Sequence, residues 1–236
     1  MNRWLVVETL SLNGPHGVIA YADTPRQWSS LNRVSSRLGQ AASSQIAAVL
    51  RDCRESSERS EVASVIGRGS AVRIVGVPIL GEYGVVHGVH LWCGSVDLCR
   101  SEPRVVAAWE WDSHTKLAHH GPGIEVEILG ISKEAQREKR APTDFFRRVV
   151  RFDDRESYYQ FVDDLDAVRP WSGEITVRRE DGTLRQLQMV ARAYTEGSAR
   201  SARGLFTTSR TFARLRRHSK FRLCVRSPLP MVTQSG

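Results

Sequence analysis

Apolar and polar side chains alternate along the segment from Trp171 to Ala193, which is interrupted by one short polar stretch. In an extended chain, Ile175 and Val177 point to one face while Thr176 points to the other. After the interruption the apolar face continues with Leu187, Met189 and Ala191. The pattern predicts two β-strands that share one face turned toward a core.

The polar stretch between these strands, Glu180-Asp181-Gly182, predicts a hairpin. Asp-Gly tolerates the positive φ that tight turns require, so the dipeptide is a strong local signal between two alternating runs.

A helical pattern precedes the hairpin. Its apolar residues recur every three to four positions and therefore share one stripe of a helix. These residues are Tyr158, Phe161, Val162, Leu165 and Val168. Asp153 or Asp154 is expected to cap the start, with Glu156 completing a capping box opposite Asp153. Pro170 is expected to end the helix.

Shorter apolar runs lie upstream. Val106 to Trp111 is expected to form a strand, and Ile124 to Ile131 a short strand or a turn of helix. Pro142 marks a break before Phe145 and Phe146.

The first hundred residues predict another sheet. Arg3 to Leu10 is a strand candidate. The apolar runs Val72 to Leu80 and Val85 to Cys93 flank a glycine-bounded turn and predict a hairpin. Ser35 to Arg54 repeats apolar residues near 3.6 positions, which predicts a helix packed across this sheet.

Several short motifs occur in one order along the second half of the chain. They are WEWD at Trp109 to Asp112, EILGI at Glu127 to Ile131, FDDR at Phe152 to Arg155, WSGE at Trp171 to Glu174 and RREDG at Arg178 to Gly182. The ordered series resembles a PAS domain with its C-terminal strands, from about Val106 to Phe206. The same pieces would also suit an unrelated α+β domain with one amphipathic helix and a hairpin.

The N-terminal half carries a similar resemblance. Its run VPILGEYGVVHGVHLWCG is similar to the terminal strands of a PAS or GAF domain. Together with the initial WLVVETL, the tandem arrangement resembles a family of actinobacterial PAS–GAF–PAS proteins of unassigned biochemical role. Such relatives carry a third module, for which this chain has no matching segment after Thr208.

We therefore expect an α+β protein with two tandem PAS/GAF-like domains, each an antiparallel sheet with flanking helices. The N-terminal domain is expected to span residues 1–105 and the PAS-like domain residues 106–208, with a linker around Ser101 to Val106. Residues 209–236 are expected to form a basic tail.

Composition supports an ordinary globular protein. The 236 residues are 41% hydrophobic and 25% charged, and the length suits two domains of common size. No apolar run approaches the roughly 18–20 residues that cross a bilayer, and Glu8 interrupts a run too short for a signal peptide. A cytoplasmic location is expected.

The net charge of +8 comes from the end of the chain. Residues 197–236 contain eight arginines and one lysine but no acidic residue, so the first 196 residues are close to neutral. Three interpretations are open: a basic arm for nucleic acid or an anionic membrane, a disordered terminus, or a non-native reading frame. Nucleic-acid binding is the less favoured interpretation.

The sequence signals for a metal site and for a reactive thiol are weak. The pairs His119-His120 and His87 with His90 would each point to different sides of an extended segment, so neither suits one metal, and loop or surface positions are expected. Cys53, Cys93, Cys99 and Cys224 form no CxxC pair and are expected to be reduced thiols. Asp163, Asp164 and Asp166 are expected on a solvated helix face.

The catalytic motifs sought are absent from the sequence. Gly67-Arg-Gly69 lacks a phosphate-loop context and is expected to be a turn, and no GxSxG nucleophile elbow occurs. Most aromatic residues are expected in the core. A PAS-like sheet can enclose an apolar cavity, which the resemblance would line with Trp111, Phe161 and Leu187.

The sequence therefore favours a non-enzymatic sensory or regulatory protein that binds a small molecule or a protein partner, with no metal and no identified cofactor. The alternative is a scaffold or homodimerisation module whose cavities are filled by side chains. A third possibility is attachment to nucleic acid or a membrane surface through the tail.

Overall fold

A computed structural model describes residues 3–11, 14–22, 24–35, 40–66, 70–137, 139–165, 169–196 and 199–208. The predicted basic tail, the predicted turn at residues 67–69, and Asp166, Val168 and Cys224 lie outside these residues. No helix in the described part of the chain is long and apolar enough to span a membrane.

The N-terminal half forms a six-stranded antiparallel sheet, which we call sheet 1. Its strands are β1 (Arg3–Glu8), β2 (Gly17–Tyr21), β3 (Thr24–Ser30), β4 (Ser60–Ile66), β5 (Ser70–Leu80) and β6 (Val86–Ser95), in the order β3-β2-β1-β6-β5-β4. The strand predicted at the N-terminus and the β5–β6 hairpin are both confirmed.

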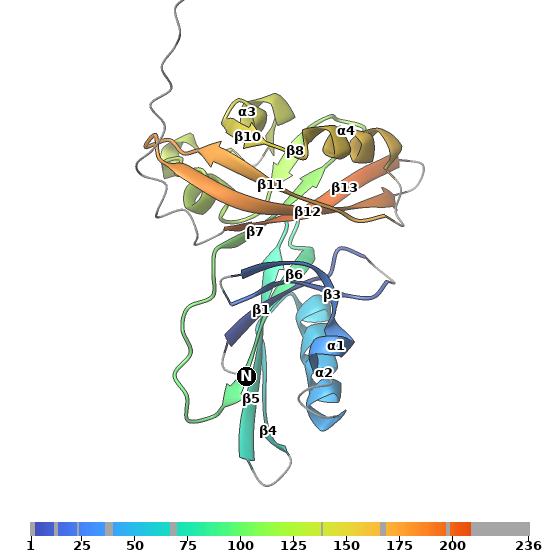
Figure 1. Cartoon of the computed structure of the whole chain (residues 1–236), viewed down its shortest axis with the longest axis vertical. Helices are drawn as coiled ribbons and strands as arrows, with labels where there is room; N and C mark the ends of the chain where they lie inside the picture. The colour runs from blue at the N-terminus through green and yellow to red at the C-terminus, as the bar shows by residue number, and fades with distance from the viewer. Residues whose placement is uncertain are drawn as a thin grey trace, which may run out of the picture.

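One long helix covers a face of sheet 1. α1 (Leu31–Ser35) precedes α2 (Gln40–Ser56), which lies within and slightly beyond the predicted helical segment. Its buried side chains are Ala42, Ile46, Val49, Leu50 and Cys53. All of these except Ala42 join Leu5 and Val7 of β1 in an aliphatic core, and Figure 1 shows α2 running alongside the sheet.

The C-terminal half forms a seven-stranded antiparallel sheet, which we call sheet 2. Its strands are β7 (Val106–Trp111), β8 (Ala118–His120), β9 (Lys139–Arg140), β10 (Val149–Phe152), β11 (Trp171–Arg178), β12 (Leu184–Glu196) and β13 (Ala199–Thr208), in the order β10-β11-β12-β13-β7-β8-β9. Antiparallel sheets with flanking helices give the expected α+β class, and the strand order is consistent with the PAS-like fold that the motifs indicated.

The hairpin at the centre of the sequence prediction is confirmed. β11 and β12 pair with Ile175 opposite Leu187, and Gly182 has the positive φ of 78° that the turn needs. Ile175, Val177, Leu187 and Met189 are all buried in one core cluster.

Short helices cover the face of sheet 2 that lies away from sheet 1 (Figure 1). They are the π-helical turn η2 (Ile124–Ile128), the 3-10 turn η3 (Lys133–Ala135), α3 (Pro142–Phe146) and α4 (Arg155–Asp164). The helical alternative for the segment 124–131 is thus confirmed over Ile124–Ile128, and Pro142 occupies the first turn of α3, where its missing N–H costs nothing.

The predicted start of α4 is confirmed, whereas its predicted capping and its predicted end are wrong. Asp154 is the N-cap residue, but its carboxylate accepts a hydrogen bond from the Glu174 N–H at 3.2 Å instead of capping the helix. Asp153 binds Arg151, so no capping box forms with Glu156. The helix ends at Asp164 because Leu165 adopts the left-handed conformation (φ 44°), well before Pro170.

The two sheets pack against each other through the faces that their helices leave open. A buried apolar cluster joins Val6, Leu10, Ile19, Ala20 and Ile79 of the N-terminal half to Ala108, Val190 and Leu205 of sheet 2. The change of sheet falls between Ser95 and Val106, the segment that contains the predicted linker, and Trp4 Nε1 donates a hydrogen bond to Ser101 O there at 2.6 Å.

Candidate functional site

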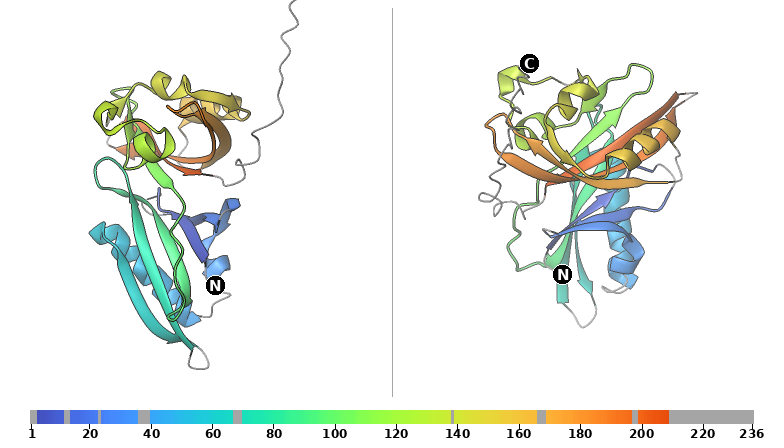
Figure 2. Two further views of the ribbon diagram at one scale, coloured as in Figure 1. Left: turned by 90° about the vertical axis from the view of Figure 1, so that its left-hand side faces the viewer. Right: turned by 45° about the horizontal axis from the view of Figure 1, so that its top comes forward.

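The β5–β6 turn carries sheet 1 into contact with sheet 2, and Figure 2 shows it reaching the upper sheet. Gly121, just after β8, donates its N–H to Ala108 O at 2.8 Å and lies beside the Leu80 carbonyl of sheet 1. A Cβ on Gly121 would lie 2.5 Å from Leu80 O and 2.8 Å from Ala108 O. Only glycine allows the two backbones to approach this closely.

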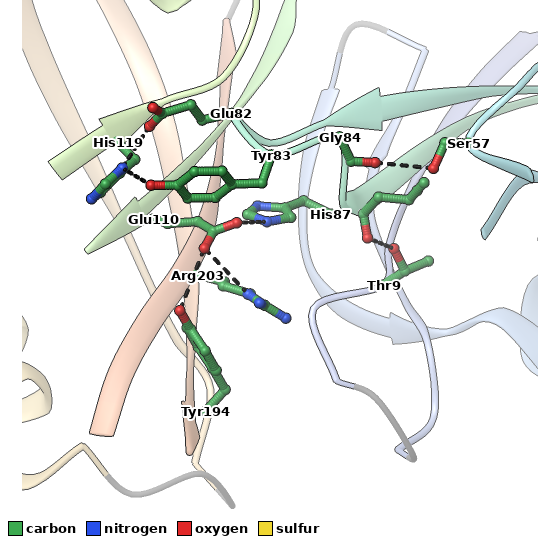
Figure 3. Close-up of polar contacts among 11 residues, drawn as sticks. Thr9, Ser57, Glu82, Tyr83, Gly84, His87, Glu110, His119, Tyr194 and Arg203 are labelled. Carbon is green, nitrogen blue, oxygen red and sulfur yellow. Dashed lines mark hydrogen bonds and ion pairs between the residues drawn. The ribbon is translucent and has the colours of Figure 1, made fainter. Parts of the chain in front are cut away.

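A buried polar cluster lies beside this contact, made of His87 from β6, Glu110 from β7, Tyr194 from β12 and Arg203 from β13 (Figure 3). We call it the junction cluster. His87 Nε2 donates to Glu110 Oε1 at 2.7 Å, and the Tyr194 hydroxyl donates to Glu110 Oε2 at 3.4 Å. Arg203 Nε lies 3.6 Å from the same oxygen, and its guanidinium stacks 3.9 Å from the centroid of the Tyr194 ring.

Glu110 remains an ionised carboxylate although it is buried. Burial favours the neutral carboxyl, but the hydrogen bond and charge of His87, followed by the charge of Arg203, lower the pKa of Glu110 below its ordinary value. The Glu110 carboxylate therefore links His87 of sheet 1 to Tyr194 and Arg203 of sheet 2.

A second polar contact crosses the junction at the turn itself. His119 Nδ1 of β8 lies 2.6 Å from Glu82 Oε2 and 2.8 Å from the Tyr83 hydroxyl (Figure 3). Glu82 and Tyr83 belong to the β5–β6 turn, whereas His119 belongs to sheet 2. The turn is thus held by hydrogen bonds to His119 on one side and by the close contact at Gly121 on the other.

A third charged pair lies elsewhere between the sheets. Arg192 Nη2 of β12 is 3.2 Å from Glu8 Oε1 of β1, and the Arg192 guanidinium lies 4.5 Å from the ring centroid of Trp28. Glu8 also accepts hydrogen bonds from the N–H groups of Leu10 and Gly17. Its complete burial raises the pKa of the carboxyl, which Arg192 partly opposes.

The expectation of loop or surface histidines is wrong. His87, His90, His119 and His120 are all at most 7% exposed, because the opposite sheet or the short helices cover the strands that carry them. His120 Nδ1 lies 2.7 Å from Glu125 Oε1, where Arg140 also binds. Burial, reinforced by the charge of Arg104, lowers the pKa of His90 to about 4, so this ring is neutral at physiological pH.

A pocket of about 400 Å³ opens at the junction cluster. We call it the junction pocket. The residues that line it are Thr9, Leu10, Arg51, Arg54, Glu55, Ser57, Tyr83, Gly84, Val85, Val86, His87 and Arg203. Hydrogen bonds from Thr9 Oγ1 to Val86 O at 3.0 Å and from Ser57 Oγ to Gly84 O at 3.0 Å fix its rim (Figure 3). Its volume is in the range of small-molecule sites, and its walls come from both halves of the chain.

The core of sheet 2 contains a much smaller apolar cavity of about 40 Å³. Trp111 lines it, together with Trp109, Phe145, Tyr158 and Phe206. Phe161 and Leu187 are buried in the same core but do not border the cavity. This volume holds a few water molecules at most and is far below that of a ligand site.

The side-chain chemistry of the junction is that of ion pairing and proton binding. Among the described residues, no group of three or more His, Cys, Asp or Glu side chains could hold a metal ion. His87 Nδ1 has no hydrogen-bond partner in the described part of the chain, so no hydroxyl or thiol is paired with it as a nucleophile. Asp163 and Asp164 are exposed, as expected for a solvated helix face.

The comparisons with known proteins agree with this architecture. Residues 3–102 match the family model described as Rv3651-like, N-terminal. No curated protein matches the chain. The crystal structure of an uncharacterized protein from Mycobacterium tuberculosis is similar, with a TM-score of 0.76 at 16% identity over 89% of this chain and 64% of that chain. At this identity the likeness shows a shared fold, and this chain spans less than two thirds of that protein.

Two further solved structures share less of the fold. A sensory box histidine kinase/response regulator from Burkholderia thailandensis gives a TM-score of 0.35 at 17% identity, over 44% of this chain and 76% of that chain. An RNA-binding light-oxygen-voltage receptor gives 0.37 at 17% identity, over 49% and 32%. Similarities this low carry no argument about the function of this chain.

The sequence interpretation did not single out Glu8, Glu82, Glu110 or Arg203 as site residues. A signal was nonetheless present for two of them. Glu8 follows the apolar run WLVV, and Glu110 lies between two tryptophans of a strand that was expected to be apolar. A carboxylate inside an apolar strand must be paired when it is buried, so each could have been identified as one half of a buried contact.

Proposed function

We propose that this protein is a non-enzymatic sensory or regulatory protein in which two PAS-like modules respond together to a small molecule. The observation that carries the proposal is the junction pocket, whose walls come from α2 and β6 in one half and from β13 in the other. A ligand in this pocket would contact both halves at once and could therefore change how they pack.

The small size of the internal cavity of sheet 2 supports the choice of the junction pocket as the ligand site. At about 40 Å³ it is already filled by aromatic side chains, whereas the junction pocket has about ten times that volume. The response would be a shift between two arrangements of the modules, which requires a ligand that binds one arrangement more tightly than the other.

The test is a thermal-shift screen of the purified chain against a panel of metabolites, followed by a blocking substitution. Val85 is 38% exposed and lines the junction pocket, so Val85→Trp should fill the pocket without disturbing a core. Leu98→Trp is the matched control, because Leu98 is a similarly exposed apolar residue outside the pocket. We expect a stabilising ligand whose effect disappears in Val85→Trp and persists in Leu98→Trp.

Absence of any stabilising metabolite would contradict the proposal. A ligand that stabilises Val85→Trp as strongly as the wild-type protein would place the binding site elsewhere and would contradict it as well.

The scaffold alternative is favoured by a different surface. Val150 on the edge strand β10, Tyr159 on α4 and Leu184 on β12 are each at least 44% exposed. Edge strands with exposed apolar residues can pair with another chain. Light scattering that shows a concentration-dependent dimer, lost in Val150→Lys, would support this alternative, and a strict monomer at high concentration would remove it.

A further inference from the structure

We propose that the junction pocket binds a small anion, a carboxylate or a phosphate, and that its arginines are the recognition groups. This inference rests on the proposed function and specifies the chemistry of its ligand. Three arginines line the pocket, Arg51 and Arg54 from α2 and Arg203 from β13, against one acidic side chain, Glu55. The lining therefore carries a surplus of positive charge, although the first 196 residues are together almost neutral.

Arg203 provides the strongest argument, because its guanidinium is incompletely satisfied. Its side chain is 14% exposed, and its contact with Glu110 is an ion pair at 3.6 Å rather than a hydrogen bond. Within the described residues, Arg203 Nε has no hydrogen-bond partner. Buried donors are normally hydrogen-bonded, so the Nε–H of Arg203 favours a closer acceptor than Glu110 provides.

The Glu110 carboxylate does not supply a hydrogen bond to the Nε–H of Arg203. The carboxylate already accepts the short hydrogen bond from His87 at 2.7 Å and the longer one from Tyr194 at 3.4 Å. Tyr194 stacks against the guanidinium of Arg203 and holds it in place (Figure 3). The guanidinium is thus positioned at the wall of the pocket before any ligand arrives.

Arg51 and Arg54 approach from the other half of the molecule. They are three residues apart near the C-terminal end of α2, so they lie on the same side of the helix. Arg54 is additionally 3.2 Å from His16 Nε2, and burial, followed by the charge of Arg54, lowers the pKa of His16. That ring stays neutral and leaves the positive charge on Arg54.

The chemistry of the ligand follows from these groups. Arginine guanidinium groups bind carboxylates and phosphates through paired, charge-assisted hydrogen bonds. An anion between α2 and β13 would contact cations from both halves of the chain and would tie sheet 1 to sheet 2. A pocket of about 400 Å³ accommodates a metabolite of modest size but not a polymer.

The test is isothermal titration calorimetry on the full chain at low ionic strength with inorganic phosphate, sulfate and succinate, and with glycerol as a neutral probe. We expect saturable binding of at least one anion and none of glycerol. Arg203→Gln should weaken binding at least tenfold, and Arg203→Lys should recover part of it through charge alone. Arg51→Gln should weaken binding about threefold to tenfold, and because Arg51 is 65% exposed this variant should fold normally.

Arg151→Gln is the matched control. Arg151 is 70% exposed and pairs with a nearby aspartate as Arg51 does, but it does not line the junction pocket. Its affinity should equal that of the wild-type protein. Equal binding by all variants, or no saturable anion binding, would overturn the inference.

The outcomes separate this inference from the proposed function. If a neutral metabolite binds and Val85→Trp abolishes its binding, the junction pocket is a ligand site and only the anion chemistry is wrong. If neither anions nor any metabolite bind, both proposals fail.

Discussion

Sheet 1 and sheet 2 differ in what covers them, although five strands of each share one order. These orders are β2-β1-β6-β5-β4 and β8-β7-β13-β12-β11. In each, the strand that comes first in the chain (β1 or β7) lies beside the strand that comes last (β6 or β13), with a hairpin partner on one side and a meander on the other. Sheet 1 buries its covered face under the single helix α2 and an aliphatic core. Sheet 2 uses several short helices and an aromatic core that includes Trp109, Phe145, Tyr158 and Phe206.

This difference indicates where recognition can occur. The cavity in the sheet 2 core measures only about 40 Å³. Two larger pockets, of about 550 Å³ around Arg140 and Arg148 and of about 290 Å³ beside α1 and α2, each lie within one half of the chain, whereas the junction pocket is lined by both halves. The buried charged contacts that involve Glu8, Glu82 and Glu110 lie instead where the two open faces meet. The two sheets thus share a strand order, have separate hydrophobic cores and meet through several polar contacts.

The largest effects are expected from truncating one core at a time. Phe206→Ala in sheet 2 should lower the free energy of unfolding by about 3–5 kcal/mol, and Ile46→Ala in α2 by about 2–5 kcal/mol. Because the apolar cluster around Val190 and Leu205 joins the sheets, each variant should shift one common unfolding transition. Calorimetry combined with hydrogen exchange of both halves measures this.

If the two halves of the chain unfolded independently, the measurements would give a different result. Phe206→Ala would then move a transition seen in sheet 2 and leave the protection of α2 unchanged. That outcome would show that the junction contributes little to cooperativity.

A substitution at the contact between the sheets should also destabilise the protein, by less than truncation of a core. Gly121→Ala places a Cβ 2.5 Å from Leu80 O, and a backbone carbonyl can yield only if the sheets separate slightly. We expect a loss of about 1–3 kcal/mol in chemical denaturation. Gly182→Ala is the control, because its Cβ would meet nothing within 4 Å and its positive φ should cost only about 1 kcal/mol. Equal losses in the two variants would mean that the close approach is unimportant.

The elements that the sequence predicted well are those whose pattern is local. The β11–β12 hairpin depends on alternation and on Asp181-Gly182, and α2 on a repeat near 3.6 residues, so each could be read from neighbouring positions. β4 was not predicted, although its pairing with β5 is regular from Ser60 opposite Gly76 to Ile66 opposite Ser70. Its serines and glutamate conceal the strand period.

The site was harder to predict because it depends on contacts between residues far apart in the chain. His87 and Glu110 are 23 residues apart and belong to different sheets, and Glu8 and Arg192 are 184 residues apart. Alternation within one strand specifies a face but not which other sheet covers it. The histidines were therefore expected at the surface, although the packing of the two sheets buries them.

The stability contributed by a buried ion pair between η2 and β9 should depend strongly on pH. Arg140 binds Glu125 through Nε and Nη2 at 2.7 and 2.6 Å, and His120 approaches from the other side. Although burial opposes ionisation, these contacts lower the pKa of Glu125 to about 2 from 4.5. The stabilisation is therefore fully present above pH 4.5 and is lost as the pH falls toward about 2.

Glu125→Gln should remove stability on the order of 3 kcal/mol near pH 7, consistent with the size of the pKa shift. The difference between wild type and variant should shrink as the pH falls from 4.5 to about 2, as measured by urea denaturation at each pH. A difference that stays constant across this range would show that the carboxylate charge is not the stabilising element.

The smallest effect is expected for an ion pair of the same chemistry on the surface of sheet 2. Arg151 Nε lies 2.9 Å from Asp153 Oδ2, a distance similar to those between Arg140 and Glu125. The side chains of Arg151 and Asp153 are 70% and 64% exposed, against 15% and 7% for Arg140 and Glu125. Water and salt screen the exposed pair, and ordering two long side chains costs entropy. Arg151→Ala should therefore leave the melting temperature unchanged within error, at low and at high salt, whereas a loss comparable to that of Glu125→Gln would show that burial does not distinguish the two pairs.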